Sequence, residues 1–522
     1  MTRRRWSALI AVWLWGFAIG GASAGTADCY DSSLEVDDAM RVATLRVIAR
    51  KVPMLDLRQW QVSGPALPGE HVYSLDIGAS VLPEGRQYPA VIRIAPTAVA
   101  VSLREMIHPQ KSTFDKICEH VELRYDGRSG QSSQNLLEGY AIFQQRLSGS
   151  GPLLLADERV PEELLIQYRM WLGRAQNFYR SVIGPEKQDV RSIVFLLDQE
   201  KSDQSGCRFS GSSLPGLLLI GIRGGCLSAD VGIPEGLPHF IAHEAFHQWN
   251  QGVQQVQSLP MATRIMLLEG GAELAASAFV SSNRGSTSHG LQRGVAAAAE
   301  SCLDQVEYKQ RPLNELIGEG EHQLSYSCGM LYTFLRLLRA GSDPIAALGP
   351  FWRSILVQPT SVRPDAEVAF DNAFMAEPLR QKKVNELLAE SGYALHAATG
   401  GLDRDQQFRI AVELLREVSR NDCHGSYGLL TGGGEILIDP EIVRCDSLTP
   451  GGRPVAVDGF NLREEVLSAR SAWLSACTNE AQVRISYADS HAHPSVVRCS
   501  LPPKSLYTPY RLSRMQEGEN HD

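Results

Sequence analysis

The chain reads Phe240-Ile-Ala-His243-Glu244-Ala-Phe-His247-Gln-Trp249 in the stretch that decides its fold. Histidines four residues apart on a helix lie one turn apart on the same face, so His243 and His247 can share a metal ion. Glu244 lies about 100° around the helix and can take a proton from a water that the metal activates. A chance occurrence is expected on the order of a few times in a hundred chains of this length. The alternative interpretation is a helix that carries two core histidines.

The composition is that of a globular protein with several domains. The chain has 522 residues, of which 43% are hydrophobic and 21% are charged. This length predicts about three domains. Acidic residues outnumber basic ones by 59 to 50. The sequence has no cluster of basic residues that could bind nucleic acid, so we expect no nucleic-acid partner.

The first 24 residues have the pattern of an export signal. Arginines at positions 3 to 5 precede an apolar run from residue 6 to about residue 19, and Ala22-Ser-Ala24 matches the small-x-small pattern of a signal peptidase site. The alternative is an uncleaved membrane anchor, for which the run is short. We expect no later segment to be apolar enough to cross a bilayer. The sequence therefore predicts a signal peptide at 1–24, a periplasmic or secreted protein, and no stable membrane span after cleavage.

Ten cysteines follow the predicted signal, and their even number favours disulfides and an oxidising compartment. No two of them have the Cys-x-x-Cys spacing of zinc fingers and redox motifs. The sequence leaves their connectivity open. Pairing of neighbours is one hypothesis, and it predicts the bridges Cys29–Cys118, Cys207–Cys226, Cys302–Cys328, Cys423–Cys445 and Cys477–Cys499.

Hydrophobic periodicity predicts a multidomain α+β fold. Residues 25–155 form a mixed, β-rich accessory domain, with alternating strands expected at 72–77 and 90–94 and a helix around 42–48. Residues 156–400 form the catalytic domain, with a long helix at 162–183, strands at 191–197 and 216–222, the histidine helix, and a mostly helical chain from 261 onward. Residues 401–522 form a small disulfide-stapled β-rich domain, with a helix at 407–419 and strands at 434–438, 453–457 and 482–487.

A catalytic zinc needs three protein ligands and an open fourth position for water. Glu269, in the segment Leu268-Glu-Gly-Gly-Ala-Glu273, supplies the third ligand from a separate element. The small residues after Glu269 would let this helix approach the histidine helix closely. Glu273 lies one turn further on and could accept a hydrogen bond from the free ring nitrogen of His243 or His247, which would fix its tautomer.

Together these two segments resemble the gluzincin metallopeptidases, particularly the aminopeptidase N-like group. That group reads His-Glu-x-x-His-x-Trp, then about eighteen residues, then Asn-Glu-Gly-x-Ala with the glutamate ligand. Here twenty-one residues separate His247 from Glu269, and Leu268 replaces the asparagine. The extra residues fit in the polar connection at 251–260, so we interpret them as a loop insertion. The resemblance covers about residues 160–340 and implies a thermolysin-like domain, with an α/β upper lobe, a helical lower lobe and one zinc per chain.

The same group carries Tyr-x-x-Gly at the start of a helix, and Tyr326-Ser-Cys-Gly329 matches this pattern. The resemblance implies that the Tyr326 hydroxyl donates a hydrogen bond to the oxyanion of the tetrahedral intermediate. The alternative is a tyrosine at an ordinary helix start. The group's Gly-x-Met-Glu-Asn signature, which captures the free amino end of a substrate, is absent, and residues 216–226 occupy its place. Backbone groups of that strand could still pair with an extended peptide, as an exposed sheet edge does.

These features predict an exported zinc metallopeptidase that hydrolyses peptide bonds in a peptide or protein substrate. Its predicted metal ligands are His243, His247 and Glu269, with Glu244 as the general base and Tyr326 as the oxyanion donor. One alternative is a catalytically silent gluzincin-fold protein that acts as a peptide-binding or assembly module. Another is a structural zinc site, which would need a fourth protein ligand and would leave Glu244 idle. The sequence leaves exopeptidase or endopeptidase specificity and the oligomeric state open.

Overall fold

The computed structural model describes residues 29–515 except for 38, 50–59, 65–67, 78–88, 96–97, 103–115, 126–127, 130–139, 145–153, 158, 186–190, 197–206, 215–216, 225–235, 284–286, 322, 342, 358–364, 398–401, 403, 424–428, 433–434, 439–444, 480, 490–492 and 500–509. The predicted signal peptide at 1–24 lies outside the described residues. The predicted bridges Cys29–Cys118 and Cys207–Cys226 involve side chains outside them as well, so both stay predictions.

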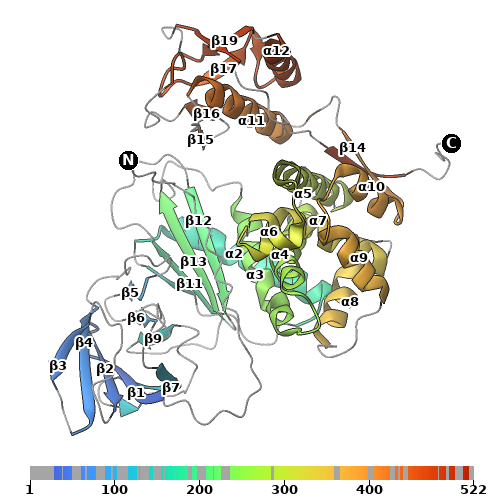
Figure 1. Cartoon of the computed structure of the whole chain (residues 1–522). Coiled ribbons are helices and arrows are strands. Elements are labelled where there is room, and N and C mark those ends of the chain that lie inside the picture. Colours follow the sequence, from blue (N-terminus) through green and yellow to red (C-terminus); the bar gives the residue numbers. More distant parts are fainter. Residues whose placement is uncertain are drawn as a thin grey trace. The chain divides into compact units, whose positions relative to one another are not determined.

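The described chain divides into two compact units. One comprises residues 1–180 and 185–249, and the other comprises residues 181–184 and 250–522. Both contain helices and sheets, which confirms the α+β class. Figure 1 shows the elements in chain order.

The first unit begins with a sheet in the order β3-β4-β2-β1-β7-β8, in which β1 and β7 run parallel. The helix expected around 42–48 is wrong, because this segment is a strand. It buries every second side chain, so that Ala43, Leu45 and Val47 are 0% exposed. Its β-branched residues favour the extended backbone over a helix. The strands are β1 (Cys29–Val36), β2 (Val42–Ile48), β3 (Gln61–Gly64), β4 (Glu70–Asp76), β7 (Lys116–Tyr125) and β8 (Arg128–Ser129).

Two smaller sheets of this unit share a core. Ile92 and Ala100 of the first pack with Ile193, Phe195 and Leu219 of the second. The first sheet, in the order β5-β6-β9, contains β5 (Val91–Ala95), β6 (Ala98–Val101) and β9 (Ala141–Gln144). The second, in the order β10-β11-β13-β12, contains β10 (Leu154–Ala156), β11 (Arg191–Leu196), β12 (Cys207–Leu214) and β13 (Leu217–Gly224). The strands expected at 191–197 and 216–222 are confirmed as β11 and β13.

Two helices complete the first unit. The long helix expected at 162–183 is confirmed as α2 (Glu162–Val182), which buries residues at spacings of three and four, among them Tyr168 and Tyr179. Gly184 follows at φ 120°, a backbone conformation that favours glycine at a helix end. The histidine helix is α3 (Leu237–Asn250).

The second unit is built around one central helix. Most residues of α4 (Met261–Asn283) are buried, and α4 packs against α5 and α7. By length and composition α4 could cross a membrane, so the expectation that no later segment is apolar enough is wrong; 83% of its most apolar stretch is buried inside the protein. The other elements here are η3 (Gln251–Gln255), α5 (Thr287–Lys309), α6 (Leu313–Gly318), α7 (Gln323–Ala340), α8 (Pro344–Val357), α9 (Asp365–Met375), α10 (Gln381–Ala389) and β14 (Tyr393–Ala397).

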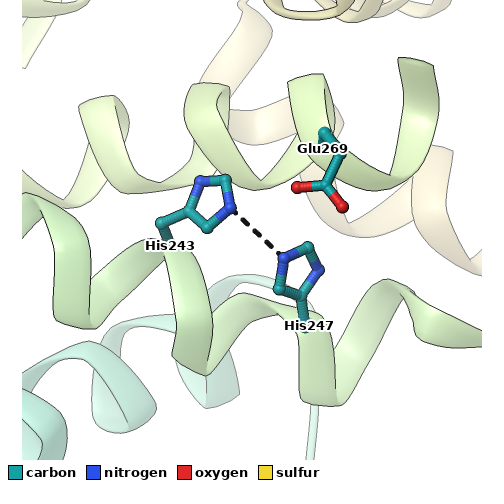
Figure 2. Close-up of side chains that lie close together, drawn as sticks. All are labelled: His243, His247 and Glu269. Atoms are coloured by element: carbon teal, nitrogen blue, oxygen red, sulfur yellow. Dashed lines mark hydrogen bonds between the residues drawn. The ribbon is translucent and has the colours of Figure 1, made fainter. Parts of the chain in front are cut away.

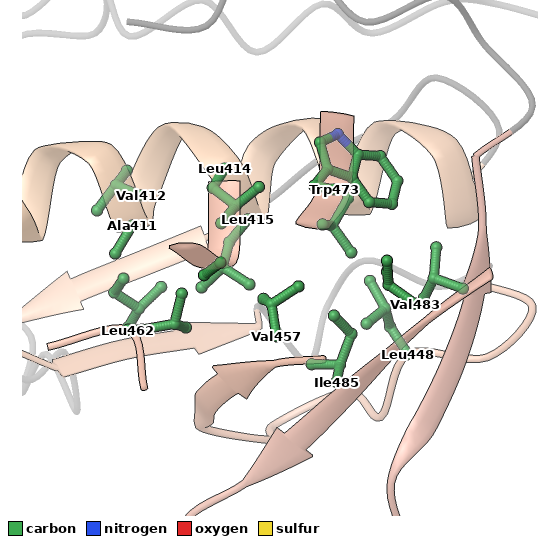
Figure 3. Packing of buried hydrophobic residues seen from close by; sticks show 14 of the residues in the cluster. Ala411, Val412, Leu414, Leu415, Leu448, Val457, Leu462, Trp473, Val483 and Ile485 are labelled. Atoms are coloured by element: carbon green, nitrogen blue, oxygen red, sulfur yellow. The ribbon is translucent and has the colours of Figure 1, made fainter. Parts of the chain in front are cut away.

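The C-terminal part of this unit has a core of its own. Trp473 of α12 and Leu415 of α11 pack over strand residues such as Val457 and Ile485 (Figure 3). The predicted bridges Cys423–Cys445 and Cys477–Cys499 are confirmed, as is Cys302–Cys328 between α5 and α7. The elements are α11 (Arg404–Asp422), β15 (Leu429–Gly432), β16 (Glu435–Ile438), β17 (Pro454–Val457), β18 (Phe460–Asn461), α12 (Val466–Thr478), β19 (Gln482–Tyr487) and β20 (Ser495–Arg498).

The last described strand does not belong to that C-terminal core. β21 (Tyr510–Arg514) pairs antiparallel with β14 and packs against α5. The backbone N–H of Tyr510 donates to the buried carboxylate of Glu300. The polypeptide between β14 and β21 is therefore attached to the helical part at both of its ends.

Candidate metal centre

The rings of His243 and His247 on α3 point their Nε2 atoms toward each other. The Nε2 atoms of His243 and His247 are 3.2 Å apart, and the ring planes meet at 84°. Both side chains are buried, with 5% and 7% of their surface exposed. Spacing by four residues on a helix therefore aims two metal-binding nitrogens at one point.

Aromatic packing and one buried amide hold α3 in place. The hydroxyl of Tyr179 on α2 donates to the backbone carbonyl of Ala242, at 3.0 Å. The Tyr179 ring packs edge-on against Phe246 and Trp249, with centroids 5.1 Å and 5.3 Å away. At the end of the helix, the Asn250 amide nitrogen donates to the carbonyl of Leu268, the residue before Glu269, at 2.7 Å.

Glu269 completes a buried group that could hold a metal ion. His243, His247 and Glu269 each offer one ligand atom, and these atoms all lie within 4.8 Å of one another (Figure 2). Two nitrogens bound to a tetrahedral metal at about 2.0–2.1 Å lie roughly 3.3 Å apart, close to the observed Nε2–Nε2 distance. Two imidazoles and a carboxylate are also an ordinary donor set for a divalent transition metal. The residues present therefore fit a metal site.

Glu244 lies against the bare backbone of β12. It follows His243 on α3 and is 8% exposed. A Cβ atom built on Gly211 would lie 2.5 Å from the Cγ of Glu244 and still closer to its carboxylate. The carboxylate therefore occupies space that any side chain at position 211 would need.

A neutral hydroxyl pair lies near this carboxylate. Tyr168 of α2 donates to the Oγ of Ser192 on β11 at 3.0 Å, and both residues are buried. Burial raises the pKa of the Tyr168 phenol above its usual value, and the negative charge of Glu244 acts in the same direction. Tyr168 is therefore a neutral group in the surroundings of Glu244 at physiological pH.

The other two predicted residues lie on the expected elements. Glu273 is half-buried on α4, one turn after Glu269, and Tyr326 is half-buried in α7, close to the start of that helix. Around these histidines, the described residues that could hold a metal ion together are His243, His247 and Glu269. The roles of Glu273 and Tyr326 stay predictions.

The glycines after Glu269 leave room for two further helices. A Cβ atom on Gly270 would overlap the backbone of Gly329 in α7, and one on Gly271 would lie 2.5 Å from the ring of Trp352 in α8. These glycines thus accept α7 and α8. A Cβ atom on Gly271 would also lie 3.6 Å from the amide nitrogen of Asn250, the last residue of the histidine helix, so the expected close approach to that helix stays a prediction.

The exposed strand edge also differs from the expected one. An exposed edge was expected within 216–226, but β13 pairs with β11 on one side and with β12 on the other, so β13 lies inside the sheet. Among the described strands, the sheet has two edges, β10 and β12, and β12 pairs only with β13. Gln248 of α3 donates to the Oγ of Ser213 on this strand at 2.5 Å. Sequence reasoning missed β12 because its Ser- and Gly-rich segment has low strand propensity, although a glycine inside a strand is itself a signal of close approach.

A second cluster of potential ligands does not form a metal site. Asp422, Cys423 and Cys445 lie close together, but the two sulfurs form a disulfide. The Asp422 carboxylate accepts backbone N–H groups of Ser447 and Leu448, at 2.9 Å and 2.7 Å. This cluster holds a turn of the C-terminal core.

No protein-family model matches the chain, and no curated protein matches it. The resemblance to the gluzincin peptidases therefore rests on the motif residues and on the buried group that they form.

Proposed function

We propose that the protein is an exported zinc metallopeptidase of the gluzincin type, with a thermolysin-like catalytic domain. One observation carries the proposal: His243, His247 and Glu269 form a buried group with ligand atoms within 4.8 Å of one another, and Glu244 stands next to it on the same helix as both histidines. A structural zinc site would need a fourth protein ligand. The group has three members among the described residues, which supports a catalytic site.

Zinc suits this donor set, because catalytic zinc sites use three histidine or carboxylate ligands and keep a fourth position open. When bound, zinc would polarise the scissile carbonyl and make water a competent nucleophile at neutral pH. The two histidines must be neutral to bind it through Nε2.

Glu244 would act as the general base. Its carboxylate would take a proton from the attacking water at one oxygen and deliver it to the leaving amine. Gly211 and α3 confine the carboxylate, so its position is set before substrate binds. The Tyr326 hydroxyl would donate a hydrogen bond to the oxyanion, a neutral donor that stabilises the charge where it develops.

An extended peptide would bind along β12. This strand is one of the two edges of its sheet among the described strands, and its backbone can pair with an incoming strand. Gly211 of β12 lies against the proposed base, so a peptide paired with this edge would run past Glu244. Three disulfides within the described residues are typical of an oxidising compartment and support export.

The test uses the mature full chain, purified with its disulfides intact. We expect about one zinc per chain by elemental analysis, and cleavage of members of an unbiased peptide library. Glu244→Gln should keep the zinc and lose peptidase activity, because the amide cannot accept the proton. Glu163→Gln, at an exposed position in the first turn of α2, is the matched control and should keep both.

Each other outcome has a definite meaning. A wild-type protein that binds no metal rejects the proposal. A protein that binds zinc and peptides but cleaves none supports the peptide-binding module instead. Library members with free and with blocked amino ends distinguish exopeptidase from endopeptidase action.

A further inference from the structure

Helices α4 and α7 touch through their backbones at two glycines. A Cβ atom on Gly329 would lie 2.7 Å from the carbonyl oxygen of Met266 and 3.0 Å from the Cα of Gly270. A Cβ atom on Gly270 would overlap the backbone of Gly329 outright. Packed helix axes are usually about 8–10 Å apart, a separation set by the side chains at the contact. Since neither helix has a side chain at this point, any larger residue here must shift one helix relative to the other.

The crossing lies next to both residues that the proposed reaction takes from these helices. Gly270 directly follows Glu269, and Gly329 lies one turn after Tyr326. A shift between α4 and α7 would therefore change the position of the third metal ligand and of the proposed oxyanion donor together.

A disulfide fixes α7 directly beside this helix crossing. Cys328 directly precedes Gly329 and is bonded to Cys302 of α5, with Cα atoms 4.8 Å apart. Both cysteines are 0% exposed. α5 also packs against α4, so the bridge connects α7 to a second neighbour of the ligand helix.

We propose that the Gly270–Gly329 contact, held by the Cys302–Cys328 bridge, positions Glu269 for the metal and Tyr326 for the substrate. Both glycines and both cysteines are positioning residues. The inference rests on the proposed function, since it concerns the same metal centre. It adds that metal affinity depends on a helix crossing and on a disulfide, neither of which supplies a ligand.

The first test is Gly329→Ala in the full oxidised chain, with zinc affinity measured by competition against a chelator. Loss of a group that orients a metal ligand typically costs about 10- to 100-fold in metal affinity, and we expect a loss in this range. Gly294→Ala is the matched control, because the nearest atoms to its Cβ would be side-chain atoms and not backbone: Ser277 Oγ at 3.2 Å, Met330 Cε at 3.3 Å and Ser277 Cβ at 3.4 Å. Its zinc affinity should stay within about twofold of wild type.

The second test removes the bridge and does not depend on the folding of Gly329→Ala. The double variant Cys302→Ala/Cys328→Ala is compared with Cys477→Ala/Cys499→Ala. The two bridges span 26 and 22 residues, so each restricts the unfolded chain to a similar extent. Removing either bridge should therefore lower the free energy of unfolding by a similar amount. Only the first double variant should bind zinc more weakly, and at saturating zinc its kcat should fall while KM changes little.

The outcomes separate this inference from the proposed function. If wild type binds zinc and both test variants match the zinc affinity of their controls, the crossing has only a structural role and the inference is overturned. Weaker zinc binding by the test variants than by their controls supports it. If the wild-type chain binds no zinc, the proposed metal centre is rejected, and this inference is rejected with it.

Discussion

The substitution Gly211→Ala should displace the proposed base, Glu244, without changing the proposed metal ligands. The new Cβ would lie 2.5 Å from the Cγ of Glu244, whereas carbon atoms in contact are about 3.5–4.0 Å apart. The Glu244 side chain must therefore move by roughly 1 Å or more. Because the atoms in the way are the end of a flexible side chain, we expect the variant to fold.

The magnitude follows from the geometry that proton transfer requires. A misplacement of about 1 Å in a catalytic constellation costs about 10²-fold in rate. We therefore expect kcat/KM to fall by about 10²-fold, which corresponds to about 2.7 kcal/mol of transition-state stabilisation. The loss should lie in kcat, since the base acts in the chemical step. Zinc content should stay at the wild-type level, because Glu244 is not a ligand.

The assay combines steady-state kinetics on a peptide identified from the library with zinc content by elemental analysis. Gly173→Ala is the control, since a Cβ there meets nothing within 4 Å. It lies inside α2 and should stabilise the protein by about 0.5–1 kcal/mol without a change in activity. Wild-type kcat in Gly211→Ala would refute the reasoning. A rise in KM alone would assign Gly211 to substrate pairing instead.

Two further predictions concern stability. Tyr332→Phe removes a buried hydroxyl that donates to Asp371 at 2.5 Å and accepts from Arg336 at 3.0 Å. It should lower the free energy of unfolding by about 1–3 kcal/mol in a urea titration, and an unchanged midpoint would contradict the prediction. Burial raises the pKa of the Glu413 carboxyl above its unfolded value, despite the neighbouring Arg416. The stability from this shift is present below about pH 4, the unfolded pKa, and is lost as pH rises through the folded pKa. The Tm of Glu413→Gln should therefore rise relative to that of wild type as the pH increases from 4 to 7. A Tm difference between the two proteins that does not change with pH would contradict the prediction.

Local sequence determined the elements that carry the proposed metal ligands. The four-residue spacing of His243 and His247 acts within one helix, so it predicted that both rings lie on the same face of α3. The pattern of apolar residues likewise located α2 and the strands β11 and β13. Neighbour pairing of cysteines was correct for the three bridges within the described residues. The helix expected at 42–48 is wrong because the alternating burial of this segment arises only in the sheet.

Only the tertiary structure decided which backbones meet. The pairing of β12 on the outside of β13, the fit of Glu244 against Gly211, and the return of β21 to β14 join residues far apart in the chain. Gly270 and Gly329 have no side chains, so no periodicity in the sequence marks their contact. The spacing of residues along one helix is set by backbone geometry, which the sequence contains. Contacts between elements depend on how every side chain of the core packs at once, and this packing exists only in the folded protein.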